Sequence, residues 1–136
     1  MKFLLGIKVT FTVIGGYIGY IFGGFDGFIY TLLAFLIFDY ITGLMVAVVE
    51  KKLSSEIGFK GIFKKIVILM LVVLSHLIDT NIIGEGSVVR NAVIFFYISN
   101  EGISIIENAV KLGLPIPGKL KDILLQLNDY KDRNGK

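Results

Sequence analysis

The 136-residue chain has no cysteine, no tryptophan, one histidine and two prolines. Without cysteine there is no disulfide, no thiolate nucleophile and no zinc site with cysteine ligands. The single histidine, His76, argues against a metal site built on histidines. The sequence also lacks a glycine-rich phosphate loop and a nucleophile spaced to meet a general base. We therefore expect no enzyme activity, no metal and no cofactor.

Charged residues are also scarce, at 18%, whereas 54% of the residues are hydrophobic. The mean hydropathy is +0.78. A soluble domain of this length needs far more polar surface, so the composition is typical of a membrane protein. The net charge of +3 is modest, and it does not indicate a nucleic-acid partner.

Four apolar stretches dominate the chain, at about residues 3–23, 28–49, 62–79 and 88–110. Each is close to the ~20 residues that a helix needs to cross a bilayer. The alternation typical of a β-barrel is missing. We expect an all-α polytopic membrane protein with about four transmembrane helices in residues 1–112. A fold with three crossings is the alternative, and it would place the first stretch on or outside the membrane.

Positive charge is unevenly distributed between the connections. The segment 50–65 carries five lysines and the tail after residue 110 carries six basic residues, whereas the turns 24–27 and 80–87 carry none. The positive-inside rule then places the N-terminus, this loop and the tail in the cytoplasm. Arg90 is the single charge that opposes this orientation.

The fourth stretch carries polar side chains that share one side of a helix at about 100° per residue. They are Tyr97, Asn100, Glu101, Ser104, Glu107 and Asn108. An isolated carboxylate in hydrocarbon costs on the order of 3 kcal/mol, so this side must face protein or water. It is either a buried, hydrogen-bonded seam in a helical bundle or the lining of a water-filled path.

Other charges also fall within apolar stretches and need partners. Asp39 requires a hydrogen-bond donor or a proton. Depth along the helices predicts the pairs Lys8–Glu107 and Arg90–Asp79, within one chain or between chains. His76 lies on the same helix side as Asp79 and is either a pH sensor or a polar group near a helix end.

Small residues spaced four apart predict helix-packing surfaces in two stretches. The first is formed by Gly15, Gly19 and Gly23, and the second by Gly43 and Ala47. Pro115 and Pro117 then end the fourth stretch. Residues 113–136 predict a cytoplasmic amphipathic helix with a basic tail. Its apolar side comprises Ile116, Leu120, Ile123, Leu124 and Leu127, and Lys119, Lys121, Asp122 and Asp129 lie around the other side.

Several motifs, taken in order, resemble the toxin-secretion and phage-lysis holin family of Gram-positive bacteria and their phages. They are Asp39-Tyr40-Ile41-Thr42-Gly43, the basic loop with Ser54, Ser55, Gly58, Phe59, Gly61 and Lys65, the segment Asn100 to Asn108, and Gly113 to Lys121. The resemblance covers residues 39–127, about two thirds of the chain. It implies a small protein of the cytoplasmic membrane that assembles into lesions passing an endolysin or a large toxin.

The two lines of evidence combine into one hypothesis. The polar stripe is hidden against Lys8, Asp39 and backbone in a compact protomer, and it lines the lumen of a homo-oligomeric lesion surrounded by lipid. The alternative is a small proton- or cation-coupled transporter that uses Asp39 and Glu101. A second alternative is an accessory subunit that scaffolds other membrane proteins.

Overall fold

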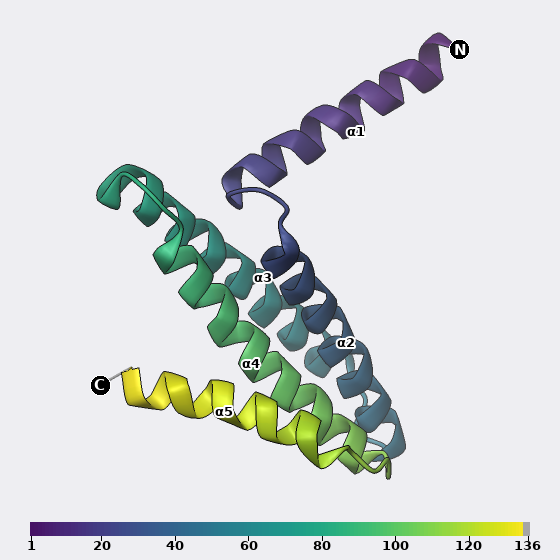
Figure 1. Cartoon of the computed structure of the whole chain (residues 1–136). Helices are drawn as coiled ribbons and strands as arrows, with labels where there is room; N and C mark the ends of the chain where they lie inside the picture. Colours follow the sequence, from purple (N-terminus) through teal and green to yellow (C-terminus); the bar gives the residue numbers. More distant parts are fainter. Residues whose placement is uncertain (135–136) are drawn as a thin grey trace.

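The structure is a computed structural model that describes residues 1–134, with side chains described through residue 126. Its helices are α1 (Lys2–Ile21), α2 (Gly27–Val49), α3 (Ser55–Ile78), the π-helical turn η1 (Asp79–Ile83), α4 (Val88–Lys111) and α5 (Gly118–Asn134). No strand occurs in this described part, which confirms the all-α prediction. Helices α2, α3 and α4 form a bundle, α5 packs against α4, and α1 extends away from the bundle (Figure 1).

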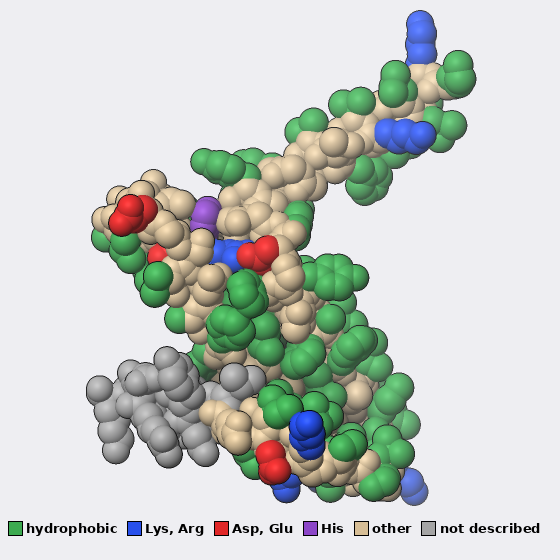
Figure 2. All heavy atoms as spheres, in the orientation of Figure 1, with side chains coloured by type: hydrophobic (Ala, Val, Ile, Leu, Met, Phe, Trp, Pro, Cys, Tyr) green, Lys and Arg blue, Asp and Glu red, His purple; other side chains and the backbone are tan. Residues whose placement is uncertain are grey.

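Three segments are long and apolar enough to cross a membrane: α1, α2 and the continuous helix Ser55–Ile83. Helix α4 has 24 residues, but Arg90, Glu101, Glu107 and Lys111 make it more polar. Apolar side chains cover α1 and much of the visible face of the bundle (Figure 2). Three of the four predicted crossings are thus supported, and a crossing by α4 stays a prediction.

The core of the bundle is apolar and lies between α2, α3 and α4. It contains Ile29, Leu32, Leu36, Ile68, Val72, Ile94 and Ile98. Leu32, Val72 and Ile94 are completely buried, one from each helix. The three helices therefore hold one another through ordinary side-chain packing, and polar contacts fix their register.

Helix α3 begins earlier than the hydropathy predicted, at Ser55 instead of about residue 62. The hydroxyl oxygen of Ser54 accepts a hydrogen bond from the backbone N–H of Ile57 at 3.2 Å. This cap satisfies an amide that the start of the helix leaves unpaired. Lys60, which precedes the predicted stretch 62–79, consequently lies in the helix together with Lys64 and Lys65.

Helix α1 has little contact with the bundle. A Cβ on Gly15 would meet no atom within 4 Å, and Gly19 faces only the ring of Phe25, which a Cβ would approach to 3.1 Å. Gly23 lies beyond the helix, in a turn with a positive φ of 80° that favours glycine. Of the predicted surface of Gly15, Gly19 and Gly23, only Gly23 meets other helices, through His76 of α3 and Arg90 of α4. The role of this surface between copies stays a prediction.

The segment after α4 breaks around Pro115 and Pro117 before α5 starts at Gly118. Leu124 of α5 is buried, and a Cβ on Gly102 of α4 would lie 3.0 Å from it. The predicted positions Leu127 and Asp129, and the tail charges after them, lie outside the residues whose side chains are described. The placement of α5 at the inner membrane surface and the division at residues 112 and 113 stay predictions.

Candidate functional site: a lysine shared by two carboxylates

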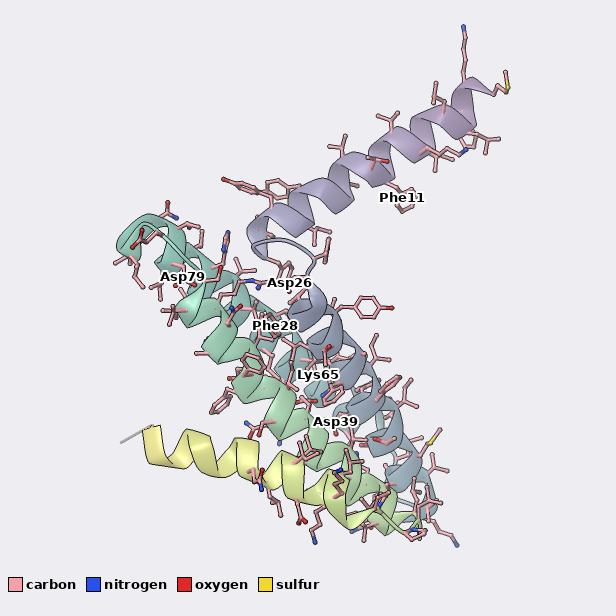
Figure 3. All side chains as sticks on the ribbon, viewed as in Figure 1. Phe11, Asp26, Phe28, Asp39, Lys65 and Asp79 are labelled. Atoms are coloured by element: carbon pink, nitrogen blue, oxygen red, sulfur yellow. The ribbon has the colours of Figure 1, made fainter. Side chains whose placement is uncertain are left out.

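Three oppositely charged side chains from three helices meet inside the bundle. The ammonium of Lys65 on α3 donates to Asp39 Oδ2 of α2 at 2.8 Å and to Glu101 Oε2 of α4 at 2.6 Å. The side chains are only 17%, 15% and 11% exposed, respectively. Figure 3 shows Lys65 and Asp39 in the middle of the bundle, well away from α1. We call Asp39, Lys65 and Glu101 the triad.

The triad forms because its members lie at the same height along their helices. Asp39 precedes the last residue of α2, Val49, by ten residues, and Glu101 precedes the last residue of α4 by ten. Lys65 follows the first residue of α3 by ten. At 1.5 Å per residue, each lies about 15 Å from the same end of the bundle. Helix α3 runs antiparallel to α2 and α4, and the three groups therefore meet at one height of the bundle.

Asn108 extends this polar contact toward the end of α4. Its amide nitrogen donates to Thr42 Oγ1 at 2.9 Å and to Asp39 Oδ1 at 3.2 Å. The Thr42 hydroxyl donates in turn to the carbonyl of Phe38 at 2.7 Å. Thr42 lies on α2, as Asp39 does, so α2 and α4 are joined by a polar seam two turns long.

The triad carries two carboxylates and one ammonium, so its formal charge is −1. Buried charges are costly unless they are paired, and removal of one partner typically costs about 3–5 kcal/mol. Lys65 is the only cation in the triad, and all three helices depend on it for compensation of buried charge. This makes the arrangement specific to one packing of α2, α3 and α4.

A second polar cluster lies at the opposite end of the bundle, around the guanidinium of Arg90. It makes five hydrogen bonds, to the carbonyls of Phe22 and Gly24, to both carboxylate oxygens of Asp26 and to the side chain of Asn91. Arg90 is only 1% exposed. These bonds fasten the turn between α1 and α2 to the start of α4. The hydrogen bond from Arg90 also lowers the pKa of Asp26 below its ordinary value.

The prediction that Arg90 forms an ion pair with Asp79 is wrong, because Arg90 pairs with Asp26. Asp79 accepts hydrogen bonds from the backbone N–H groups of Val89 at 3.1 Å and Arg90 at 2.8 Å. It therefore caps the start of α4, and the guanidinium of Arg90 reaches Asp26 at 2.8 Å instead. His76 is half-buried beside the turn between α1 and α2, where its Nδ1 would lie 2.6 Å from a Cβ added to Gly23.

The predicted Lys8–Glu107 pair is not formed within the protomer. Lys8 is exposed on α1, and Glu107 is exposed in a groove between α4 and α5. A pair between copies stays a prediction. The hypothesis of a compact protomer is therefore wrong about Lys8, because α1 leaves the bundle. Asp39, the other partner expected for the polar stripe, does contact α4, through Asn108.

The polar stripe of α4 divides between two environments. Glu101 contacts Lys65 of α3 and Asn108 contacts α2, whereas Asn100 and Ser104 are half-buried and Glu107 is exposed. Tyr97 borders a groove next to α3. Gly43 and Ala47 lie on α2 near α4, where Ala47 is buried and a Cβ on Gly43 would lie 3.8 Å from Asn108. Whether these residues line a pore stays a prediction.

The sequence analysis named neither Lys65 nor Asp26 as a site residue. Lys65 is one of the lysines that the charge pattern predicts to be cytoplasmic, and its depth relative to Asp39 and Glu101 follows only from the helix bounds of the structure. Asp26 lies in the turn 24–27, for which the sequence pattern indicated only a lack of positive charge. Among the described residues, no group of three metal-ligating side chains occurs.

Comparison with known proteins identifies a family and several relatives. The model of the bacteriophage holin family matches residues 16–129. An uncharacterized protein of Listeria innocua is 45% identical over 119 residues, covering 88% of this chain and 84% of the relative. An uncharacterized 14.9 kDa protein from the nagH 3′ region of Clostridium perfringens is 42% identical over 125 residues, covering 92% and 95%. No solved structure matches.

The family match includes α2, α3 and α4, and therefore every member of the triad. It also agrees with three helices apolar enough to cross a membrane. The chain belongs to the bacteriophage holin family.

Proposed function

We propose that this protein is a holin that oligomerises in the bacterial cytoplasmic membrane and forms lesions, through which an endolysin or a large toxin leaves the cell. In this proposal α4 is a fourth crossing, and both termini lie in the cytoplasm. The observation that carries the proposal is the triad. A buried ionic contact between three helices has a defined closed state and a water-exposed alternative.

The closed state is the protomer described above. Lys65 compensates Asp39 and Glu101, and Asn108 donates to Asp39. Separation of α4 from α2 and α3 would leave these groups unpaired in hydrocarbon, which is costly. In an oligomer the same groups face water in a common lumen. Water then replaces the partners, so the two states differ by only a few kcal/mol, as a switch requires.

The proposed lumen is lined by the polar side of α4, comprising Tyr97, Asn100, Glu101, Ser104, Glu107 and Asn108. Glu107 supports this assignment because it is already exposed and unpaired among the described side chains. Gly15 and Gly19 on α1 provide the proposed contact between copies, because small residues allow close approach of helices in membranes.

The test is Glu101→Leu, expressed with an endolysin in a bacterium. The variant keeps Lys65 paired with Asp39 in a neutral couple, so we expect normal membrane insertion. Lysis time should change severalfold or lysis should fail, because the lumen loses a charge and the closed state loses a contact. Culture density and membrane potential report the outcome. Glu85→Leu, an exposed acid in the connection before α4, is the control and should lyse on the normal schedule. Unchanged lysis time for Glu101→Leu contradicts the proposal.

The shared lysine also favours a second candidate, a proton- or cation-coupled transporter. Two carboxylates that compete for one ammonium at the same depth resemble the ion sites of carriers. Expression separates the two candidates. A holin collapses the membrane potential abruptly and releases a co-expressed endolysin, whereas a transporter gives ion-dependent growth without lysis.

A further inference from the structure

A groove separate from the triad runs along α3 beside α4. It has a volume of about 1130 Å³ and extends from Glu56 in the first turn of α3 to Leu71. At 1.5 Å per residue this is roughly 22 Å of helix. The part of the groove farther from Glu56 is lined by Val67, Ile68, Leu71 and Tyr97. The groove is therefore basic at one end and apolar along the rest.

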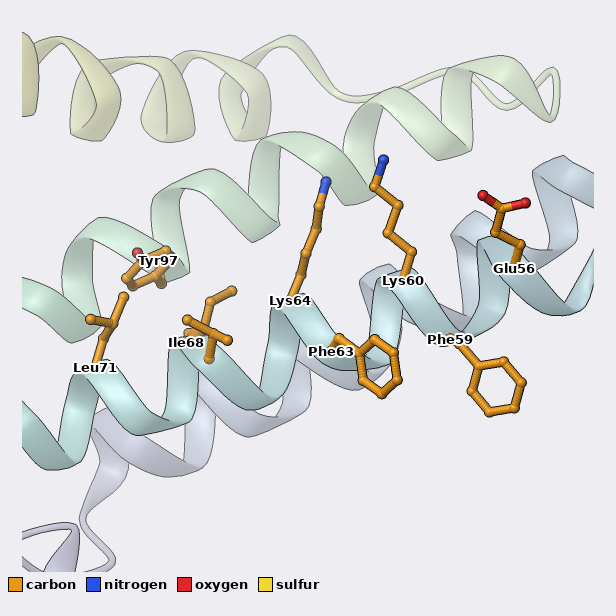
Figure 4. A pocket seen from close by; sticks show the side chains of 9 residues that line it. Glu56, Phe59, Lys60, Phe63, Lys64, Ile68, Leu71 and Tyr97 are labelled. Atoms are coloured by element: carbon orange, nitrogen blue, oxygen red, sulfur yellow. The ribbon is translucent and has the colours of Figure 1, made fainter.

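The basic end is formed by Lys60 and Lys64. They lie one turn apart and point the same way from α3, toward α4 (Figure 4). Both are exposed, and neither forms an ion pair with any side chain that the structure describes. Lys65, one residue further, is rotated by about 100° and points into the bundle, where the triad satisfies it. Lys60 and Lys64 are thus available for a ligand.

The charges fit an anion at the membrane surface. Lys60 and Lys64 lie within the first three turns of α3, at the end where the membrane span begins. Lysine side chains commonly extend from an apolar surface to the headgroup level. Glu56 at the same end leaves a local charge of +1, which complements a single negative charge.

We propose that this groove binds an anionic phospholipid, with Lys60 and Lys64 contacting its phosphate and the apolar part holding one acyl chain. A phosphate ion from solution would leave the apolar part of the groove empty. A lipid of zero net charge would leave the charge of one lysine uncompensated. The site requires only that α3 lies in a membrane, and it does not depend on lesion formation.

Because the chain has no tryptophan, one introduced tryptophan is the only source of tryptophan fluorescence. Phe63 is 61% exposed beside the groove, so Phe63→Trp provides a single reporter there. The full-length variant is placed in vesicles containing phosphatidylglycerol or phosphatidylcholine with brominated acyl chains, which quench tryptophan on contact. We expect the association constant for the anionic lipid to exceed that for the zwitterionic lipid about fivefold.

Substitutions identify the residues responsible. Lys60→Gln with Lys64→Gln should bring the ratio of the two constants close to one. The matched control, Lys51→Gln with Lys52→Gln, removes the same charge from the connection before α3 and should keep the preference. Phe38→Trp places the reporter on the exposed surface of α2 and should show little preference.

Three results would overturn the proposal: equal quenching by both lipids, a preference that survives the Lys60 and Lys64 changes, or an equal loss in the control pair. Circular dichroism shows whether the double variant is folded. If the double variant loses helix content, the lipid preference is instead measured at increasing salt on the Phe63→Trp protein that keeps Lys60 and Lys64. Screening by salt should lower the preference for the anionic lipid. A preference insensitive to salt would also contradict the site.

Discussion

Lys65 determines the charge balance of the bundle, since its ammonium lies within hydrogen-bonding distance of two carboxylates. An ammonium in the interior is stable only with such partners, and the carboxylates depend on it in turn. Asp39 also accepts from Asn108. Glu101 has no second cationic partner among the described residues, so Lys65 alone compensates its charge.

At the residue scale we expect Lys65→Met to destabilise the protein by about 3 kcal/mol, because two buried carboxylates lose their only cation. The midpoint of denaturation in detergent, followed by circular dichroism, measures the effect. Adding Asp39→Asn and Glu101→Gln to the same variant should recover most of the loss. Lys52→Met, whose side chain is 73% exposed, should stay within about 0.5 kcal/mol of the parent. Equal effects of the two lysine changes would mean that the triad does not stabilise the fold.

At the scale of elements, the turn between α1 and α2 is the only covalent link between α1 and the bundle, and Arg90 fastens it to α4 through hydrogen bonds with Phe22, Gly24 and Asp26. Asp26 also caps α2 by accepting from the backbone N–H of Ile29 at 3.0 Å. One carboxylate thus joins the starts of two helices. The direction in which α1 leaves the bundle depends on this junction.

The junction predicts a pH dependence for Asp26→Asn. Asparagine caps helices as well as aspartate does, so the substitution removes mainly the charge. Because the pKa of Asp26 is lowered in the folded protein, its contribution is present above the unfolded value of 3.8 and is lost as pH falls through the folded value. Asp26 is 45% exposed, so we expect less than about 1 kcal/mol.

The measurement compares denaturation midpoints of parent and variant at about pH 7 and about pH 2.5. The difference should favour the parent near neutrality and vanish in acid. Asp122→Asn, at an exposed residue without an ion pair among the described side chains, serves as the control and should show no such difference. A difference for Asp26→Asn that is unchanged in acid would rule out the ionic contribution.

At the scale of the whole molecule, α1 is an apolar helix that projects from the bundle with almost its entire surface uncovered (Figure 1). Phe11, for example, is 72% exposed on it. A single apolar helix is stable in lipid, yet the open face at Gly15 offers a closer contact to another helix. Under the proposed function, this other helix belongs to a second copy of the chain.

This neighbour can be detected by disulfide formation, because the chain has no cysteine of its own. Gly15→Cys in membranes should give oxidised dimers, since thiols at a close helix contact meet the geometric limits of a disulfide. Val13→Cys places the thiol about 160° around the same helix and should give few dimers. Similar yields at both positions would indicate random collision and would remove the proposed contact.

The sequence by itself determined the helical class, the approximate extent of the apolar helices and the need of Asp39 and Glu101 for partners. Hydropathy and helical periodicity are local properties, so they can be read along the chain. The N-terminal cap at Ser54 was also local, and its omission moved the predicted start of α3 from Ser55 to about residue 62.

Only the tertiary structure decided which charges meet. Lys65 takes the place expected for Lys8 because α3 lies beside α2 and α4, whereas α1 turns away. Arg90 pairs with Asp26, and Asp79 caps α4, because the turn before α2 folds over the start of α4. Ion pairs between helices depend on how the helices are packed and rotated, and this information is absent from the spacing of residues within each one.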